Sequence, residues 1–265
     1  MNANLLLLTL CQGLFLTNNV TFIAINGLVG LALAPLGWMA TLPVMGYVVG
    51  GALSTGMVAR SQSRFGRKTS FQLGLVVAFL SALLCAYAAF SRNFWLLCAA
   101  TLVAGYYNAN AGLYRFAAAE VAGSTAQEKA VSLVMAGGLL GAIAGPNLAA
   151  WTRNLFPVPF AGAYIALAGV ALLGMLALAF ITFPPVPPKK AGQQGRPLSQ
   201  IMKQPVFIVA AATGALSFGV MNLLMAATPI AMQQCGLPFS DAALVLEWHV
   251  IGMFAPGFFT GNLIK

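Results

Sequence analysis

The chain has 265 residues, of which 60% are hydrophobic and only 6% are charged. Soluble domains carry about 25% charged residues, so this chain lacks the polar side chains that a water-facing surface requires and is predicted to be an integral membrane protein. Its 13 basic and 4 acidic residues give a net charge of +9, but the basic residues lie between apolar runs. This placement argues against nucleic-acid binding and predicts contacts with the anionic headgroups of a lipid bilayer on its cytoplasmic side.

The apolar segments, taken in chain order, predict eight transmembrane helices. The first runs from Leu5 to about Ala34 without the basic start or the small-residue cleavage site of a signal peptide. Crossing about 30 Å of hydrocarbon requires roughly 20 helical residues. The runs are continuous rather than alternating, so strands are not expected and the fold is predicted to be all-α. The predicted spans are residues 5–32, 37–59, 69–90, 94–117, 130–153, 160–183, 206–230 and 241–262.

The basic residues between these spans predict the orientation of the chain. With the N-terminus in the cytoplasm, eleven of the 13 basic residues lie inside and only Arg92 and Arg153 lie outside. Cytoplasmic loops are enriched in Lys and Arg, so this is the expected orientation. The chain is therefore predicted to be a multi-pass protein of a bacterial inner membrane with a cytoplasmic N-terminus.

A segment rich in proline and polar residues separates the sixth span from the seventh. It contains Pro184-Pro185 and Pro187-Pro188. Prolines at this spacing cannot continue a helix, so an extended connection is expected. We therefore expect an N-terminal six-helix bundle over residues 1–183, a cytoplasmic linker over 184–205 and the first two helices of a second bundle over 206–265.

Residues that carry metal-binding or catalytic chemistry are scarce. His249 is the only histidine; Cys11, Cys85 and Cys98 lie inside apolar runs, and Cys235 stands alone near a loop. No disulfide framework, metal site or cofactor is predicted. An intramembrane enzyme such as a lipid-modifying transferase would need clustered acids, histidines or a metal motif, so an enzyme is the least favoured class.

A pattern of small residues followed by a basic turn occurs twice. The first copy is Gly46-Tyr47-Val48-Val49-Gly50-Gly51, followed by Arg64-Phe65-Gly66-Arg67-Lys68. The second copy is residues 252–256, followed by residues 261–265. Such an internal repeat is typical of a membrane transporter built from two similar halves, the second of which is expected to be incomplete here.

The basic turn resembles that of the major facilitator superfamily. The family's loop between helices 2 and 3 usually reads G-x-x-x-[DE]-[RK]-x-G-[RK]-[RK]. Arg64, Gly66, Arg67 and Lys68 match this pattern, whereas Ser63 replaces the acid. The resemblance implies a gating loop at the four matching residues. The replacement puts the family's usual ion-pair latch in doubt.

The fifth span contains a regular series of glycines. Gly137, Gly141 and Gly145 are four residues apart, and Pro146 follows them. Glycines at this spacing lie on one helix face and allow another backbone to approach, and the proline favours a bend. The series is similar to the family's antiporter motif, although Ala149-Ala150 replaces its closing glycine pair. A helix-packing role is predicted for the four residues.

Polar residues form a stripe on the first span. Gln12, Asn19 and Asn26 are seven residues apart, which is almost two helical turns, and Asn18 widens the stripe. Polar side chains are costly in hydrocarbon and tend to face a cavity or another helix. We expect these four to line a substrate cavity; the alternative is hydrogen bonding between helices.

The fourth span carries a second stripe, and the last two spans add isolated polar residues. Tyr107 and Asn110 belong to this stripe, with Tyr106 and Asn108 beside it. The tyrosines are too deep in the span for an interfacial belt. Cavity lining is predicted for Tyr106, Tyr107, Asn110, Asn222 and Glu247.

Glu247 is the one carboxylate clearly within a predicted span. A carboxyl group buried in the membrane favours its protonated form, which suits proton exchange. The alternative is that it reaches outward to the aqueous face.

The family resemblance implies a secondary active transporter that works by alternating access. Few charges lie on the proposed cavity-lining positions, so a small neutral or weakly charged organic solute is predicted, with a proton as a candidate coupling ion. The chain is similar to permeases labelled drug or sugar efflux, and to vitamin permeases of the riboflavin type. The alternative is an inactive fragment of such a transporter, because four further helices would have to complete the cavity.

Overall fold

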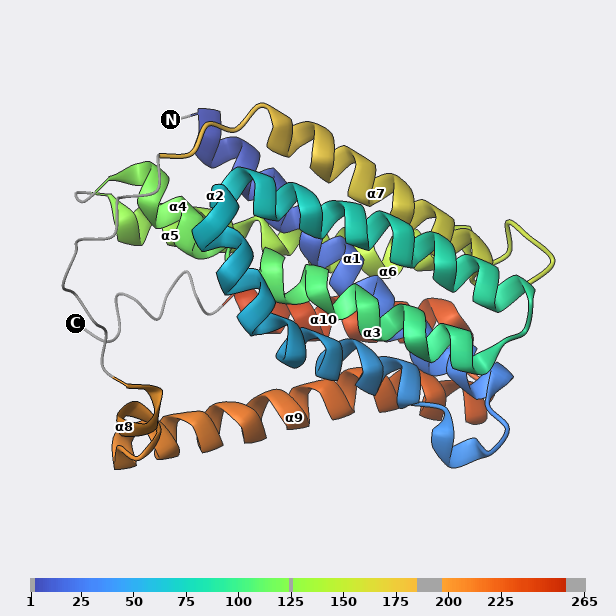
Figure 1. Cartoon of the computed structure of the whole chain (residues 1–265). Coiled ribbons are helices and arrows are strands. Elements are labelled where there is room, and N and C mark those ends of the chain that lie inside the picture. The colour runs from blue at the N-terminus through green and yellow to red at the C-terminus, as the bar shows by residue number, and fades with distance from the viewer. Residues whose placement is uncertain (1–2, 124–125, 185–196, 256–265) are drawn as a thin grey trace.

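The computed structural model describes residues 3–123, 126–184 and 197–255, and every long regular element in these ranges is a helix, which confirms the all-α prediction. Most helices run roughly alongside one another, so that the turns gather at opposite ends of the molecule (Figure 1). Five helical stretches of the described chain are long and apolar enough to cross a membrane. The elements are α1 (Ala3–Leu33), the 3-10 turn η1 (Gly37–Met39), α2 (Leu42–Phe90), α3 (Phe94–Ala111), α4 (Tyr114–Ala122), α5 (Gln127–Ala136), α6 (Gly138–Thr152), α7 (Ala161–Ala179), α8 (Leu198–Met202), α9 (Pro205–Gln234) and α10 (Phe239–Phe254).

The second and third predicted spans form one hairpin, α2. Its two arms meet at Gly66, whose φ of 79° and ψ of 170° lie outside the helical region. Glycine is almost the only residue that adopts this conformation without strain. Figure 1 shows the chain reversing direction there. Residues 60–68, which the sequence predicts to form a loop, are therefore helical except at Gly66.

The fourth and fifth predicted spans are each divided into two helices. The fourth consists of α3 and α4, which extend to residue 122 rather than 117, and the fifth consists of α5 and α6. The second division falls at Gly137, where an added Cβ would overlap the carbonyl oxygen of Thr9 on α1. The helix therefore changes course where another backbone passes close to it.

The glycine series of the fifth span packs against α1. An added Cβ at Gly141 would lie 2.5 Å from the Cβ of Leu16 and 2.7 Å from the carbonyl oxygen of Gly13. One turn further, Thr21 Oγ1 donates a 2.8 Å hydrogen bond to the carbonyl oxygen of Gly145. Pro146 follows inside α6 and is buried. Such close approach gives dispersion contacts that larger residues would prevent.

A second close crossing joins the first arm of α2 to α3. An added Cβ at Gly105 would overlap the backbone of Gly50 and Gly51 and lie 2.6 Å from the carbonyl oxygen of Tyr47. Gly46 faces Thr101 and Cys98 in the same contact. The two crossings form the pairs α1–α6 and α2–α3. Contacts of α1 with α2 and α3, such as that of the Phe22 and Tyr47 rings at 5.0 Å between centroids, join the pairs into one packed unit.

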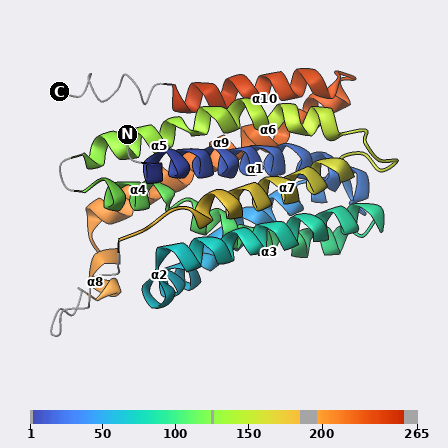
Figure 2. The ribbon, with the colours of Figure 1, turned by 90° about the horizontal axis from the view of Figure 1, so that it is seen from above.

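The last two helices contact this unit over part of their length. α10 packs against α6, and α9 meets α1 where Gly27 faces Ala226 and Ile230. Figure 2 shows α10 and the α2–α3 pair on opposite sides of α1. Residues 205–220 of α9 are exposed, so this part of α9 stands away from the bundle.

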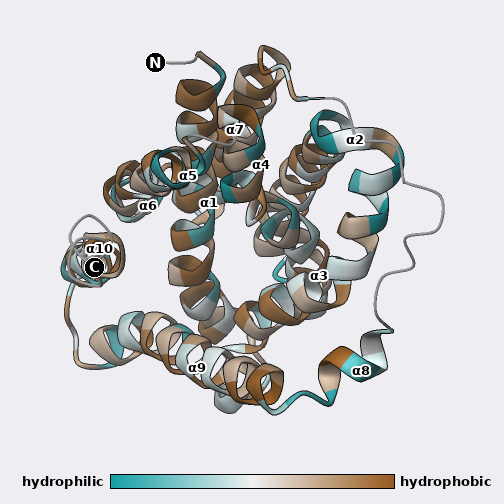
Figure 3. Ribbon diagram, turned by 90° about the vertical axis from the view of Figure 1, so that its left-hand side faces the viewer, coloured by the Kyte–Doolittle hydropathy of each residue, from teal (hydrophilic) through white to brown (hydrophobic). Residues whose placement is uncertain are grey.

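Large apolar side chains cover the outside of the molecule. Trp38, Trp151 and Val206 are 73%, 74% and 80% exposed, respectively. Figure 3, viewed from the end that carries the Gly66 turn, shows hydrophilic residues gathered on α2, α4 and α8. An apolar outer surface with polar residues near an end is the pattern expected of helices that lie in a bilayer.

The α2–α3 crossing yields a prediction about stability. We expect Gly105→Ala to lower the stability of the detergent-solubilised protein by about 1–3 kcal/mol, because its methyl group meets backbone atoms that cannot move independently. Gly169→Ala is the matched control, since an added Cβ there meets nothing within 4 Å. Thermal unfolding followed by size-exclusion chromatography measures both. Equal midpoints for the two variants would contradict the proposed packing constraint.

Candidate functional site

A cavity of about 360 Å³ lies between α1, the α2–α3 pair and the last two helices. Its walls are largely apolar and rich in Met and Phe, including Phe15, Met221, Met225 and Phe254. Ligand sites are typically concave and apolar, with a few polar groups that fix the orientation of the ligand. The polar residues that line this cavity are Gln12, Asn19, Tyr47, Asn108, Arg115 and Asn222.

Asn19 of α1 forms hydrogen bonds with side chains of two other helices, α2 and α3. Its Nδ2 donates to the Tyr47 hydroxyl at 3.1 Å and to Asn108 Oδ1 at 3.2 Å. Both N–H donors of the amide are thus used by the protein. The Asn19 carbonyl oxygen accepts no hydrogen bond from the described part of the chain, so it is free to accept one from a ligand or from water.

Asn222 brings a second amide to the cavity from α9. Its Nδ2 donates to the carbonyl oxygen of Phe218 at 2.9 Å. Its Oδ1 is buried and has no hydrogen-bond partner among the described residues. A buried acceptor left without a donor costs about 1–3 kcal/mol. An N–H or O–H group of a ligand, or a water molecule, would remove that cost.

Three of the nine residues predicted to line a substrate cavity therefore line this one, namely Gln12, Asn19 and Asn222. The other residues of the first stripe do not. Asn18 is buried without lining the cavity, and Asn26 accepts a 2.5 Å hydrogen bond from the Tyr164 hydroxyl of α7. Hydrogen bonding between helices, the alternative interpretation of this stripe, accounts for the Asn26 oxygen, whereas Asn26 Nδ2 is buried without a partner among the described residues.

The second stripe likewise faces other helices. Asn110 donates to the carbonyl oxygen of Ser70 at 2.7 Å and accepts from Gln62 at 3.2 Å, both on α2. Tyr107 is buried edge-on against Phe15, with 5.6 Å between ring centroids. Tyr106 is half-buried and does not line the cavity.

Glu247 lies between α10 and α6 rather than in the cavity. Its Oε2 accepts a 3.1 Å hydrogen bond from Asn147 Nδ2 of α6. The carboxylate is half-buried. His249 has a buried Nε2 with no partner among the described residues. No hydrogen bond joins Glu247 to His249.

Tyr47, Asn108 and Arg115 complete the polar lining, and the sequence signals for them are weak. Tyr47 is a lone polar residue in a glycine-rich span. Asn108 and Arg115 are seven residues apart, which places them on one face of the α3–α4 segment, but the neighbouring stripe through Tyr107 obscures this spacing.

The predicted gating loop makes specific contacts at the end of the molecule near Gly66. Arg67 forms an ion pair with Glu120 of α4, at 3.0 Å from Nε to Oε2 and 2.5 Å from Nη2 to Oε1, and also donates to Gln62. Lys68 Nζ donates to the carbonyl oxygen of Ala179 at the end of α7, at 2.7 Å. The loop therefore connects α2 to α4 and α7.

The loop has no acid at position 63, and its one ion pair among the described residues uses a carboxylate from another helix. Ser63 donates to the carbonyl oxygen of Arg60, and the guanidinium of Arg64 stacks on the neighbouring Phe65 ring at 5.2 Å. The carboxylate that pairs with the loop comes instead from Glu120. Lys265, which holds the acid's place in the second copy, lies outside the described residues.

Comparison with known proteins gives one consistent result. Residues 5–265 match the sequence profile of the Major Facilitator Superfamily. The chain is 39% identical to the riboflavin transporter RfnT of Brucella anthropi, over 98% of this chain and 66% of the relative. It is 27% identical to the uncharacterized MFS-type transporter YdeG of Bacillus subtilis, over 85% of this chain and 56% of the relative.

The fold also matches a solved structure. The crystal structure of a D-xylose–proton symporter superimposes with a TM-score of 0.61 at 16% identity, over 94% of this chain and 66% of that one. The chain thus spans about two thirds, or less, of the length of each of these proteins.

The cavity yields a prediction about side-chain accessibility. In a Cys235→Ser background, which removes the exposed native thiol, we expect a water-soluble maleimide to label Asn19→Cys and Asn222→Cys. Asn110→Cys is the matched control and should resist labelling, because Asn110 is only 1% exposed. Mass spectrometry of the purified full-length protein measures the labelled fraction. Equal labelling at the three positions would contradict the placement of Asn19 and Asn222 in the cavity and of Asn110 in a buried contact between helices.

Proposed function

The chain belongs to the major facilitator superfamily, and from this premise we propose that the full-length protein is a secondary active transporter of a small neutral or weakly charged organic solute. The observation that carries the proposal is the cavity between the first, second and fourth spans and the last two described helices, with two amide oxygens unpaired. The substrate would bind there, near the bilayer midplane, as in other transporters with related halves.

The packing around the cavity supports alternating access. At the end near Arg153, an added Cβ at Gly27 would lie 3.3 Å from the carbonyl oxygen of Ala226 on α9. The Phe160 and Phe239 rings also meet there, with 5.0 Å between centroids. At the other end α9 stands away from the bundle. With the N-terminus in the cytoplasm of the inner membrane, as the basic residues suggest, this is an inward-open arrangement.

The cavity chemistry favours a flat, polar organic molecule. Amide and hydroxyl groups from Asn19, Asn108, Asn222 and Tyr47 offer donors and acceptors, and the aromatic and Met side chains offer apolar faces for a ring. Arg115 is the one charged residue in the lining. Because RfnT is a riboflavin transporter, riboflavin is the first substrate that we propose to test. The direction of transport is left to the experiment.

Glu247 is the residue that we propose for proton coupling. It is half-buried in α10, the helix of the eighth predicted span, and Asn147 on the facing helix donates to it. Protonation would weaken this hydrogen bond because a neutral carboxyl oxygen is a poorer acceptor. The change would alter the α6–α10 contact, which joins the two expected bundles.

The proposed substrate site predicts the effect of removing its amides. We expect Asn19→Ala and Asn222→Ala each to weaken apparent affinity for riboflavin by about tenfold, the equivalent of about 1.4 kcal/mol for a lost hydrogen bond. Transport of labelled riboflavin by the full-length protein in proteoliposomes measures this. Gln200→Ala, at an exposed residue of α8, is the control. Unchanged affinity in both variants would remove these residues from the site.

The proposed coupling role predicts a separation of two activities. We expect Glu247→Gln to abolish transport driven by a pH gradient while preserving exchange of labelled for unlabelled substrate, because exchange requires no net proton movement. Counterflow and gradient-driven assays on the same proteoliposomes measure both. Retention of gradient-driven transport in the variant would exclude Glu247 as the coupling residue.

A further inference from the structure

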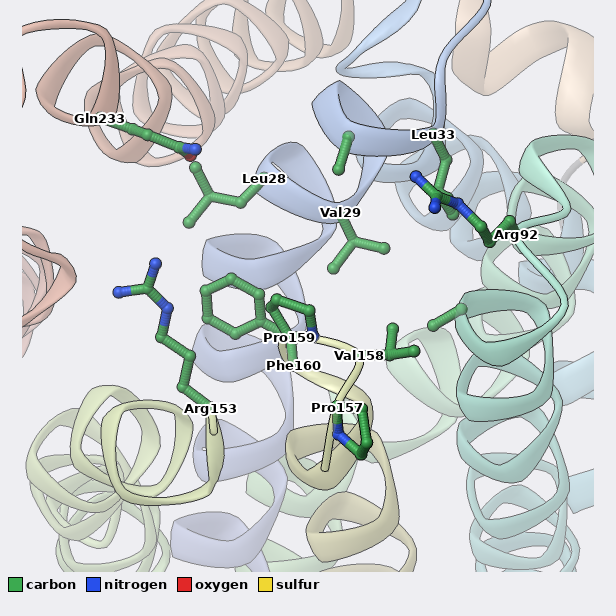
Figure 4. Close-up of a pocket in the computed structure, with 12 residues that line it drawn as sticks. Leu28, Val29, Leu33, Arg92, Arg153, Pro157, Val158, Pro159, Phe160 and Gln233 are labelled. Carbon is green, nitrogen blue, oxygen red and sulfur yellow. The ribbon is translucent and has the colours of Figure 1, made fainter. Parts of the chain in front are cut away.

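A second pocket, of about 270 Å³, lies at the end of the molecule that carries the α6–α7 loop, opposite the turn of α2. Figure 4 shows the residues that line it. It is formed by α1, the α2–α3 turn, the α6–α7 loop and α9. Its walls are apolar, with Val29, Pro157 and Val158 among them. Arg92 and Arg153 approach it from two sides, with Phe160 and Val29 between them. These are the two basic residues that the predicted topology leaves on the outer face.

Arg153 is held in place while one of its donors is unused. Its guanidinium stacks on the Phe160 ring at 5.3 Å and on the Phe239 ring at 5.6 Å. Its Nε is buried and has no hydrogen-bond partner among the described residues. An unsatisfied charged donor is more costly than a neutral one, so an acceptor at this position would be strongly favoured.

Backbone strain is concentrated at the same pocket. Arg92, with a φ of 52°, and Phe160, with a φ of 65°, are the two non-glycine residues with positive φ in the described chain, and both line the pocket. Such conformations cost on the order of 1–3 kcal/mol and cluster at ligand sites. Glycine would relieve the strain at both positions. It would also remove the Arg92 cation and the Phe160 ring, which contacts the Arg153 cation.

The charge of the pocket is not balanced by the protein. Across the described residues, the one ion pair is that of Arg67 with Glu120, at the other end of the molecule. The carboxylate nearest in sequence to the Arg153–Phe239 contact is Asp241, which is exposed and receives a hydrogen bond from Ser240. It lies more than 4.0 Å from either guanidinium. The pocket therefore presents two cations against apolar walls.

We propose that this pocket is a binding site for an organic anion, distinct from the central cavity. The ligand carries a carboxylate or phosphate group for the arginines and an apolar body for the Phe160 and Val29 walls. Guanidinium groups match both anions in geometry and charge. Because Arg153 also contacts Phe239 of α10, an anion bound there would stabilise the closed packing at this end.

Phenyl phosphate is the test ligand, because it combines a phosphate with a ring, and benzyl alcohol is the neutral control. Binding is measured on the full-length protein in phosphatidylcholine nanodiscs. We expect Arg92→Gln and Arg153→Gln each to weaken phenyl phosphate binding by at least about tenfold. Arg60→Gln removes an exposed arginine at the other end and should leave binding unchanged. Arg92 is also exposed, so its variant should fold even if Arg153→Gln does not.

Nanodiscs that contain phosphatidylglycerol distinguish two sources of the anion. Competition between this lipid and phenyl phosphate identifies a lipid headgroup as the occupant, whereas undiminished binding identifies a soluble anion. Both results support the site. Absence of phenyl phosphate binding in phosphatidylcholine, or equal binding by the wild type and both arginine variants, would overturn the proposal. Asn19→Ala should leave this binding unchanged, which separates the pocket from the central cavity.

Discussion

The close backbone contacts at glycine residues are the constraint on which the rest of this structure depends. Within a bilayer, apolar side chains gain little by leaving lipid for another helix, so association relies on dispersion contacts and on hydrogen bonds between helices. Gly141 brings α6 against α1, and Gly105 brings α3 against α2. Any side chain at these positions would force the helices apart. The crossing at Gly105 brings together α2 and α3, which carry Tyr47 and Asn108, and both of these residues accept hydrogen bonds from Asn19 of α1.

The amides of the bundle fall into two groups that differ in what they face. Asn26 and Asn110 accept hydrogen bonds from Tyr164 and Gln62 on neighbouring helices, so they contribute to packing. Asn19 and Asn222 each keep a carbonyl oxygen without a partner in the described chain. The Asn222 oxygen is buried, and an unpaired buried acceptor is costly unless a ligand or water completes it. Asn26 Nδ2 is likewise buried without a partner in the described chain, so the neighbours that each amide faces, rather than its degree of satisfaction, distinguish the cavity from the helix contacts.

The one ion pair of the described chain lies near Gly66, at one end of the molecule. There Arg67 pairs with Glu120 and Lys68 donates a hydrogen bond to a helix-terminal carbonyl oxygen, whereas Arg60 and Arg64 have no carboxylate of the described chain within 4.0 Å. At the opposite end, Arg92 and Arg153 lack any carboxylate within 4.0 Å in the described chain. The first arrangement connects helices of the same bundle. The second leaves positive charge available, and a bound anion is the simplest way to compensate it.

The sequence by itself determined the membrane class, the all-helical fold and the approximate helix positions, because these follow from the length and continuity of apolar runs. It also predicted the family, through the Arg64 to Lys68 turn. It could not determine which amides face the cavity, because a seven-residue stripe such as Gln12, Asn19 and Asn26 drifts around a helix and meets different neighbours along its length. Nor could it predict that Glu120 pairs with Arg67 of the basic turn, since these two residues are 53 positions apart. Only the tertiary structure decided these points, because each depends on which backbone lies within hydrogen-bonding distance.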